Sequence, residues 1–387
     1  MILYTRSIVK AAINHFEISI MTTNEAYQDE TFKIIIKETS KIFNVHIIDN
    51  FFLKSEDSSI NLLSNQYQYY SSIKKCYNKV YKIDKPDFIY MVNLDHFDKI
   101  LSLMGSPFKD TSYAGMLMNP KFHRMHMNIG QESRFDKLYF YLFKNLCKQK
   151  YLKKIMIVDQ VFDEYLAKLN IDLFAKRVLI NEPVDFIGSE TRIFAREELG
   201  LKESDFVILV YGSLSLRKGV RELLHSFYEL NIINIKIIIA GKINDDIVDL
   251  FKDTRFLKYK ESNRILFFPG FQDDESQYRF FKASDTVWLG YIHGFSGSSG
   301  VIYQAATMGL PVLASNYGLI GWLVNKFKIG LLFNVYNSVE IKNNIEVMYK
   351  DKDRYTLFSK NSLKFSINHT SEYFGHSIVN TILNEKD

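Results

Sequence analysis

The sequence predicts an α/β protein made of two doubly wound domains, each built on a parallel sheet. Three observations lead to this fold class. Short β-branched runs alternate with segments of helical period, which is typical of βαβ units. The length of 387 residues suits two or three domains. With 47% apolar and 24% charged residues, the composition is that of an ordinary globular chain and excludes a disordered or collagen-like one.

The alternation is clearest in the second half. Strands are predicted there at 206–211, 235–240, 265–268, 286–290, 311–314 and 330–333. Helices are expected at 218–230, 245–256, 276–283, 299–308, 319–327 and 372–384. Ligands of doubly wound sheets bind outside the carboxyl ends of the strands, where the strand order reverses. Binding residues are therefore expected in the loops that follow these strands.

The first half shows the same alternation less regularly. Its strands are predicted at 17–21, 44–48, 88–92, 113–118, 154–158 and 178–180. A helix over 6–16 comes before them, so the usual opening strand is either compressed into residues 2–5 or absent. The predicted domains are 1–184 and 185–370, and a C-terminal helix within 371–387 is expected to pack back toward the first domain.

Net charge, cysteine content and apolar runs exclude several classes of protein. The net charge of +5, from 49 basic and 44 acidic residues, is too small to indicate nucleic-acid binding. Cys76 and Cys147 are too few for a disulfide framework or a four-cysteine zinc site. No apolar run reaches the length of a membrane span, and the first residues lack a secretory signal pattern. We expect a cytoplasmic protein without a metal site.

Basic residues concentrate between 121 and 154, where nine of them accompany only two acidic residues. On a helix, Lys137, Lys144 and Lys148 share one face. Such a face is either simply solvated or rests on an anionic surface. The second interpretation predicts a peripheral position on the inner face of a membrane, or an acidic acceptor.

Two loops have the composition of phosphate-binding segments. The first runs from the strand at 286–290 through Gly297, Ser298, Ser299 and Gly300 into a helix. Glycines allow the backbone to approach a ligand, and a helix N-terminus offers unpaired N–H groups. A plain tight turn is the alternative. The glycines and hydroxyls exceed what a turn needs, so the pattern favours phosphate.

The second such loop follows the strand at 206–211. It contains Gly212 and Ser213 and then brings Arg217 and Lys218 to the carboxyl end of the strand. Lysine binds phosphate as a point charge, and arginine can grip two oxygens at once. The alternative is a pair of solvated cations.

These two loops and the motifs between them carry a family resemblance. Residues 205–335 resemble the nucleotide-sugar-binding domain of GT-B fold glycosyltransferases, most like glycosyltransferase family 4, the glycosyl transferases group 1. The motifs are Gly-x5-Lys-Gly at 212–219, Ile-Ile-Ala-Gly at 238–241, Pro-Gly-Phe at 269–271, Ala-Ser-Asp at 283–285 and Gln-Ala-x3-Gly-Leu-Pro-Val at 304–312. The first half matches the family only in outline.

The resemblance implies roles for several residues. Lys218 falls on the pyrophosphate lysine, and Arg217 replaces an arginine that the family has at Ser213. Two family glutamates fall on Ser296, which implies a donor-sugar contact, and on Gln304, which implies a ribose contact. Base recognition is expected through the backbone. The donor-binding residues implied are Gly212, Ser213, Arg217, Lys218, Gly270, Phe271, Gly297, Ser298, Ser299, Gly300 and Gln304.

The family has a catalytic histidine at a strand end of the first, acceptor-side domain. Here Asn119 takes that position, while His123 or His126 offers the chemistry and His96 is a weaker candidate. Asn119, His123 and Ser296 are the catalytic residues that we infer from the resemblance.

The resemblance implies a metal-independent glycosyltransferase that moves a sugar from a nucleoside diphosphate donor, with retention, to a glycan or lipid-linked acceptor in surface polysaccharide synthesis. The donor is a substrate, and no cofactor is expected. The alternative is a non-catalytic GT-B subunit that partners an active transferase. The sequence lacks the spacings of a paired-aspartate metal motif, of a dinucleotide fingerprint and of a serine-hydrolase elbow.

Overall fold

The computed structural model describes residues 2–39, 44–49, 59–83, 85–186, 188–295, 297 and 299–385. The chain divides into two compact units. Unit 1 consists of Met1–Pro183 and Ser371–Asp387, and unit 2 is Val184–Thr370. Every strand pair described in either unit is parallel. The predicted α/β class with two Rossmann-like domains is thus confirmed.

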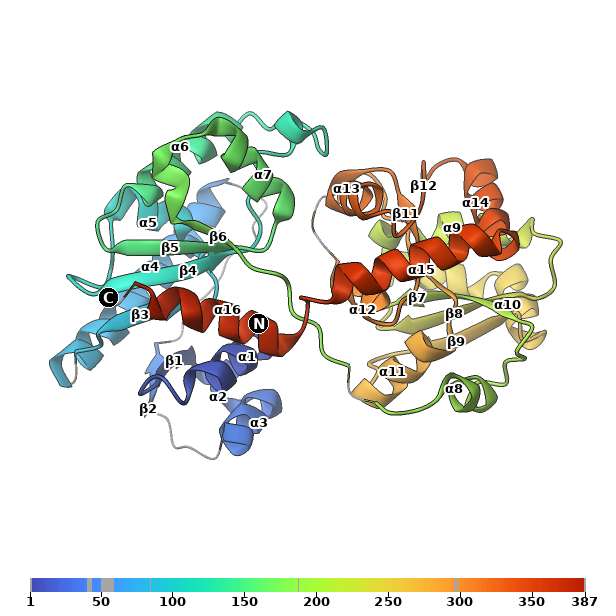
Figure 1. Ribbon diagram of the computed structural model, residues 1–387, viewed down its shortest axis with the longest axis horizontal. Helices are drawn as coiled ribbons and strands as arrows, with labels where there is room; N and C mark the ends of the chain where they lie inside the picture. Colours follow the sequence, from blue (N-terminus) through green and yellow to red (C-terminus); the bar gives the residue numbers. More distant parts are fainter. Residues whose placement is uncertain are drawn as a thin grey trace. The chain divides into compact units, whose positions relative to one another are not determined.

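Unit 2 contains one six-stranded parallel sheet (Figure 1). Its order is β12-β11-β10-β7-β8-β9. The strands are β7 (Phe206–Tyr211), β8 (Ile235–Gly241), β9 (Ile265–Pro269), β10 (Thr286–Leu289), β11 (Val312–Ser315) and β12 (Gly330–Phe333). Each differs from its predicted range by one residue at most. The chain starts at the centre of the sheet and reverses direction between β9 and β10, so the switch point lies between β7 and β10.

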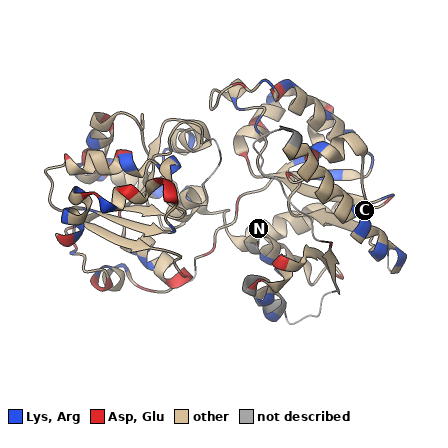
Figure 2. Ribbon diagram, turned by 180° about the vertical axis from the view of Figure 1, so that it is seen from behind, with Lys and Arg blue, Asp and Glu red and all other residues tan. Residues whose placement is uncertain are grey.

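Helices cover both faces of this sheet, because its strands are apolar on both sides. They are α8 (Arg192–Glu198), α9 (Val220–Tyr228), α10 (Thr254–Glu261), α11 (Asp274–Ala283), α12 (Gly300–Thr307), α13 (Gly318–Phe327), α14 (Ser338–Lys350) and α15 (Lys352–Ser366), with 3-10 turns η3 (Leu216–Lys218) and η4 (Asp245–Lys252). Figure 2 shows the charged residues mostly on helices and loops, with the strands mostly uncharged. Ile208, Ile237 and Ile239 of the strands are fully buried.

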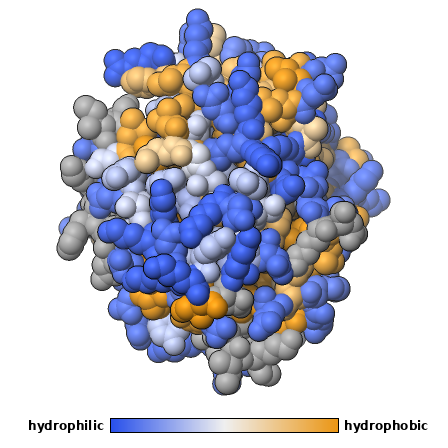
Figure 3. Space-filling model, turned by 90° about the vertical axis from the view of Figure 1, so that its left-hand side faces the viewer, coloured by the Kyte–Doolittle hydropathy of each residue, from blue (hydrophilic) through white to orange (hydrophobic). Residues whose placement is uncertain are grey.

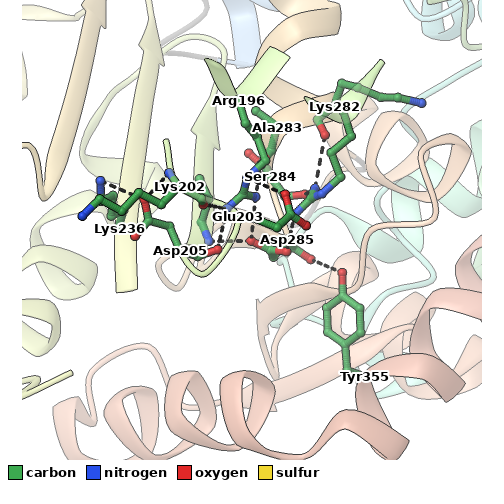
Figure 4. Close-up of polar contacts among 12 residues, drawn as sticks. Arg196, Lys202, Glu203, Asp205, Lys236, Lys282, Ala283, Ser284, Asp285 and Tyr355 are labelled. Carbon is green, nitrogen blue, oxygen red and sulfur yellow. Dashed lines mark hydrogen bonds and ion pairs between the residues drawn. The ribbon is translucent and has the colours of Figure 1, made fainter. Parts of the chain in front are cut away.

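A polar network closes the amino-terminal edge of this sheet (Figure 4). Arg196 has an exposed fraction of only 2%, and its guanidinium donates to the carbonyl of Ala283 at 2.8 Å. The carboxylate of Asp285 accepts from Arg192 at 2.6 Å and from the backbone N–H of Val207 at 2.7 Å. It also lies 3.5 Å from Arg196. The Ala-Ser-Asp motif therefore ties α8 and α11 to β7, at the edge opposite the carboxyl ends of the strands.

Unit 1 contains two separate parallel sheets. The pair β1-β2 forms one, and β3-β4-β5-β6 forms the other. The strands are β1 (Ser19–Thr23), β2 (Asn44–Ile48), β3 (Phe88–Met91), β4 (Ser112–Leu117), β5 (Leu152–Ile157) and β6 (Arg177–Leu179). All six predicted strands exist, and their bounds shift by two residues at most.

The helices of unit 1 are α1 (Ile2–Ala12), α2 (Asn24–Gln28), α3 (Glu30–Thr39), α4 (Ser59–Ile83), α5 (Asp98–Met104), α6 (Asp136–Cys147), α7 (Gln160–Leu169) and α16 (Ser371–Leu383), with 3-10 turns η1 (Met125–Met127) and η2 (Asp172–Lys176). Among the described residues, no helix combines the length and apolar character that a bilayer span needs.

The chain opens with a helix where one alternative expected a compressed strand. Residues 2–5 form the first turn of α1, so that alternative is wrong. The helix was predicted to begin at residue 6. Its inner side packs on α16, where Ala11, Ala12 and Val379 are buried together. A Cβ at Gly375 would overlap the carbonyl oxygen of Ser7, so glycine allows the two backbones to approach closely.

The Asp285 network yields a stability prediction. Asp285→Ala removes the nearer carboxylate partner of the buried Arg196 and leaves it only the exposed Glu203 at 4.0 Å. It should lower the free energy of unfolding by about 3–5 kcal/mol, since a largely buried ion pair is broken. The matched control is Asp249→Ala, whose partner Arg221 is exposed, with an expected loss of about 0–1 kcal/mol. Urea unfolding measures both. Equal losses would contradict the structural role assigned to Asp285.

Candidate functional site

The candidate site of unit 2 lies at the carboxyl ends of β7 and β10. These strands pair in parallel, with Thr286 opposite Ile208 and Val287 opposite Leu209. The segments that follow them, 212–219 and 290–295, are therefore neighbours. A backbone hydrogen bond of 3.0 Å, from the N–H of Ile292 to the carbonyl of Arg217, joins the two loops. Both segments predicted to bind phosphate thus meet at the switch point of the sheet.

Two glycines permit the tight path of the lysine turn. Gly212 has φ of +102° and Gly219 has φ of +60°, a backbone region that favours glycine. A Cβ at Gly219 would overlap the carbonyl oxygen of Gly290 and lie 3.1 Å from the side chain of Val335. Glycine at 219 therefore allows the lysine turn to touch both the loop after β10 and the loop after β12.

Lys218 is buried, with an exposed fraction of 6%. Its Nζ donates to the carbonyl of Tyr211 at 2.7 Å and to the hydroxyl of Tyr291 at 3.2 Å. For Lys218 the alternative of a solvated cation is therefore wrong. Within the described part of the chain, Lys218 takes part in no ion pair. A buried cation with only neutral partners favours an anionic ligand.

An aromatic stack covers this ammonium. The Tyr291 and Phe295 rings lie parallel with centroids 4.0 Å apart, and the Arg217 guanidinium lies 5.3 Å from the Phe295 centroid. The Tyr291 hydroxyl donates to the Ser299 hydroxyl at 2.9 Å. Ser299 makes no side-chain capping bond to α12, while the N–H of Ile302 donates to the Ser299 carbonyl at 2.9 Å. The N–H groups of Gly300 and Val301 are therefore the ones that this helix start offers to an anion.

The other predicted donor-binding residues surround this centre less closely. Ser213 is exposed, and its hydroxyl donates to the Asn244 side-chain oxygen at 3.3 Å. Gly270 has φ of +104°, and Phe271 is 93% exposed at the end of β9. Gln304 is half-buried on α12.

In the glycine loop itself, a Cβ at Gly300 would have no neighbour among the described residues within 4 Å, while one at Gly297 would touch the Phe295 ring at 3.6 Å. Ser296 and Ser298, a predicted catalytic and a predicted donor-binding residue, lie outside the described residues.

In unit 1, Asn119 stands exposed after β4 with its orientation set by two neighbours. The Asp95 carboxylate accepts from the backbone N–H of Met118 at 2.7 Å and of Asn119 at 3.0 Å. The Asn119 side-chain oxygen accepts from Arg124 at 3.0 Å. Its amide NH2 remains as the hydrogen-bond donor of this side chain. Burial raises the pKa of Asp95, against these backbone hydrogen bonds.

His123 does not reach the surface, which contradicts its predicted catalytic role. Its side chain has an exposed fraction of 0%, and its Nε2 lies 3.2 Å from Asp159 Oδ2. The other oxygen of Asp159 accepts from two N–H groups that begin α7. The His123 ring packs 4.9 Å from Phe162. A side chain without exposed surface cannot contact a substrate, so His123 contributes to the core.

The two remaining histidine candidates are exposed. His126 stacks on Tyr165 with centroids 5.5 Å apart, and His96 stacks on Tyr69 at 4.9 Å. Each therefore stacks on an aromatic ring and remains exposed.

Tyr291 and Asp95 are not among the site residues predicted from the sequence. Tyr291 follows β10 directly, and a hydroxyl at a strand end beside the switch point is a signal that could have identified it. The contacts of Asp95 with the end of β4 depend on strand pairing and leave no local signal. Among the described residues, no group of three side chains with metal-ligand chemistry converges.

Comparison with known proteins agrees with this geometry. Residues 191–365 match the family model described as glycosyl transferases group 1. Among curated protein sequences, none matches the chain.

Solved structures are similar over nearly the full length. HepE of Anabaena, in complex with UDP-glucose, is 16% identical, with 99% of this chain and 95% of that chain covered and a TM-score of 0.67. Sucrose-phosphate synthase from Thermosynechococcus elongatus is 13% identical, with 99% of this chain and 92% of that chain covered and a TM-score of 0.68. WaaG, a glycosyltransferase involved in lipopolysaccharide biosynthesis, is 12% identical, with 98% of this chain and 95% of that chain covered and a TM-score of 0.59. The resemblance to GT-B glycosyltransferases is confirmed, and the fold is theirs.

The Lys218 site yields a binding prediction. Lys218→Met keeps the length of the side chain but removes the charge, and should weaken the binding of inorganic diphosphate about ten- to hundredfold, the size of a hydrogen bond to a charged group. Titration calorimetry measures this. The control is Lys242→Met, an exposed lysine at the end of β8, which should change affinity less than threefold, roughly the effect of a screened surface charge. Equal effects of the two substitutions would exclude Lys218 as the anion-binding group.

Proposed function

We propose that the chain, which carries a glycosyl transferases group 1 segment at residues 191–365, transfers a sugar from a nucleoside diphosphate donor to a glycan or lipid-linked acceptor. The observation that carries the proposal is the buried ammonium of Lys218, which has only neutral partners in the described residues and lies beside the start of α12. A diphosphate supplies the negative charge that such a site lacks.

The departure of the diphosphate is the step that these groups favour. When the bond between the sugar and the diphosphate breaks, negative charge grows on the diphosphate oxygens. Lys218, Arg217 and the N–H groups of α12 are cationic or donate hydrogen bonds, and so stabilise that charge without a metal. We therefore propose a metal-independent reaction. Retention at the anomeric carbon and a role in surface polysaccharide synthesis follow from the resemblance to family 4 and stay predictions, as does a cytoplasmic location.

A second candidate function is a nucleotide-sugar-binding subunit without turnover. Two observations favour it: His123 is buried, and Gln304 stands where the family has a glutamate. Neither observation affects diphosphate binding, so the two functions differ in turnover rather than in affinity.

Purified protein separates the two candidates. We expect release of free nucleoside diphosphate from UDP-, GDP- or ADP-sugars when a lipid-linked or glycan acceptor is present, and loss of at least tenfold of this rate in Lys218→Met, because the leaving group loses its cation. Release is measured with a coupled nucleotide assay. Tight binding of a nucleotide sugar without turnover would support the non-catalytic subunit.

The surface of α6 is the part of unit 1 that we propose for a lipid-linked acceptor. Lys137 and Lys148 are exposed beside the apolar side chains of Leu138 and Tyr141, which are 49% and 58% exposed. Lys144 is half-buried, with its ammonium 5.8 Å from the Phe140 ring. Figure 3, which faces this end of unit 1, shows apolar patches next to hydrophilic residues near its top. Lysines beside apolar side chains suit the headgroup region of an anionic membrane.

A liposome assay tests this surface. Replacing Lys137, Lys144 and Lys148 with Gln should weaken binding to anionic vesicles about a hundredfold, at about 1 kcal/mol per lysine, while nucleotide affinity stays unchanged. The matched control removes three exposed lysines of unit 2, Lys252, Lys258 and Lys260. Equal partitioning of the native protein onto neutral and anionic vesicles would rule out electrostatic docking.

A further inference from the structure

Three aromatic side chains from three different strand ends meet at the carboxyl edge of the unit 2 sheet. His293 follows β10, Tyr317 follows β11 and Tyr336 follows β12. The His293 ring centroid lies 4.9 Å from that of Tyr317 and 5.1 Å from that of Tyr336. We refer to these three residues as the aromatic platform.

The aromatic platform is held in place and yet is open to solvent. The Tyr336 hydroxyl accepts a hydrogen bond of 3.3 Å from the backbone N–H of His293. The backbone N–H of Tyr336 donates to the Asn334 side chain at 3.1 Å. Tyr336 is nevertheless 57% exposed, His293 is exposed and Tyr317 is half-buried. Rings that served only to fill the core would be covered, so fixed and exposed rings favour a contact surface.

The aromatic platform adjoins the Lys218 site within the same unit. His293 is two residues from Tyr291, whose hydroxyl binds Lys218, so their Cα atoms are at most about 7 Å apart. On the other side, Tyr336 follows Val335, a buried residue that faces Gly219 directly after Lys218. A molecule whose diphosphate sits on Lys218 therefore has one end within reach of the aromatic platform.

The order of the strands indicates which end that is. Along the carboxyl edge the sequence of loops is β9, β8, β7, β10, β11, β12, with about 4.8 Å between neighbouring strands. The base is predicted at Gly270 and Phe271 after β9, and the diphosphate at β7 and β10. A nucleotide sugar is a linear molecule, so its sugar extends the other way, over the ends of β10, β11 and β12.

We propose that the aromatic platform binds a pyranose ring attached to the diphosphate held by Lys218. One face of a pyranose carries C–H groups, which pack on the electron-rich faces of aromatic rings, while its hydroxyls remain free for polar partners. This inference deepens the proposed function and rests on it. It gives His293, Tyr317 and Tyr336 the role of sugar-binding residues of the donor site.

Calorimetry with matched ligand pairs tests the aromatic platform. The pairs are UDP with UDP-glucose, GDP with GDP-mannose and ADP with ADP-glucose. The readout is the ratio of the dissociation constant of the diphosphate to that of its sugar. For at least one pair the native protein should bind the sugar nucleotide more tightly. Tyr336→Ala and Tyr317→Ala should each reduce that ratio about three- to tenfold, with the diphosphate affinity unchanged.

Two controls separate stacking from indirect effects. Tyr336→Phe keeps the ring but loses the hydroxyl that accepts from the His293 N–H, so the ratio should fall less than in Tyr336→Ala. Tyr141→Ala removes a tyrosine of unit 1 with nearly the same exposure, 58%, and should retain the ratio.

Three other outcomes would overturn either the sugar-binding role of the aromatic platform or the proposed function. If the ratio is 1 in the native protein or is unchanged in both alanine variants, the aromatic platform does not hold the sugar. If the alanine variants weaken the plain diphosphate equally, the aromatic platform holds the base instead. If no diphosphate binds the native protein, the proposed function itself fails, and the inference fails with it.

Discussion

The parallel pairing of β10 with β7 is the constraint on which the site of unit 2 depends. The two strands are far apart in the chain, and their pairing creates the switch point of the sheet. It brings the lysine turn and the glycine loop together and lets Tyr291 bridge Lys218 and Ser299. Without this pairing, an ammonium, an aromatic stack and a helix N-terminus would be three unrelated features of the surface.

The two edges of the same sheet are used differently. At the amino-terminal edge, the carboxylate of Asp285 lies against Arg192 and Arg196, and all three side chains bond to the backbone or to one another. Their charges are therefore already compensated within the fold. At the carboxyl edge, the Lys218 ammonium meets only neutral oxygens. Charge that is compensated stabilises the fold, whereas charge that is buried without a counter-charge is left for a ligand. The contrast separates the cations that stabilise the fold from the one for which we propose an anionic ligand.

In unit 1 the residue suited to acid–base chemistry and the residue that reaches the surface are not the same. His123, the residue with the more versatile side chain, is enclosed with Asp159 in the aromatic core. Asn119, which cannot transfer protons, is exposed and is held by Asp95 and Arg124. An asparagine with its oxygen already bonded presents an amide donor. Recognition of an oxygen atom is therefore a better match for this strand end than acid–base chemistry.

The sequence by itself determined the fold class, the strands within two residues, and the two loops that form the Lys218 site. The periodicity of apolar residues, the positions of glycines and the signals for helix starts depend only on residues that are close in the chain. They can therefore be recognised without knowledge of the tertiary contacts. Tertiary structure decided what depends on distant partners. It buried Lys218 under Tyr291, enclosed His123, compensated Asp285 and brought His293, Tyr317 and Tyr336 together. Burial and ring contacts arise only when separate strand ends meet, and no local pattern of residues encodes that meeting.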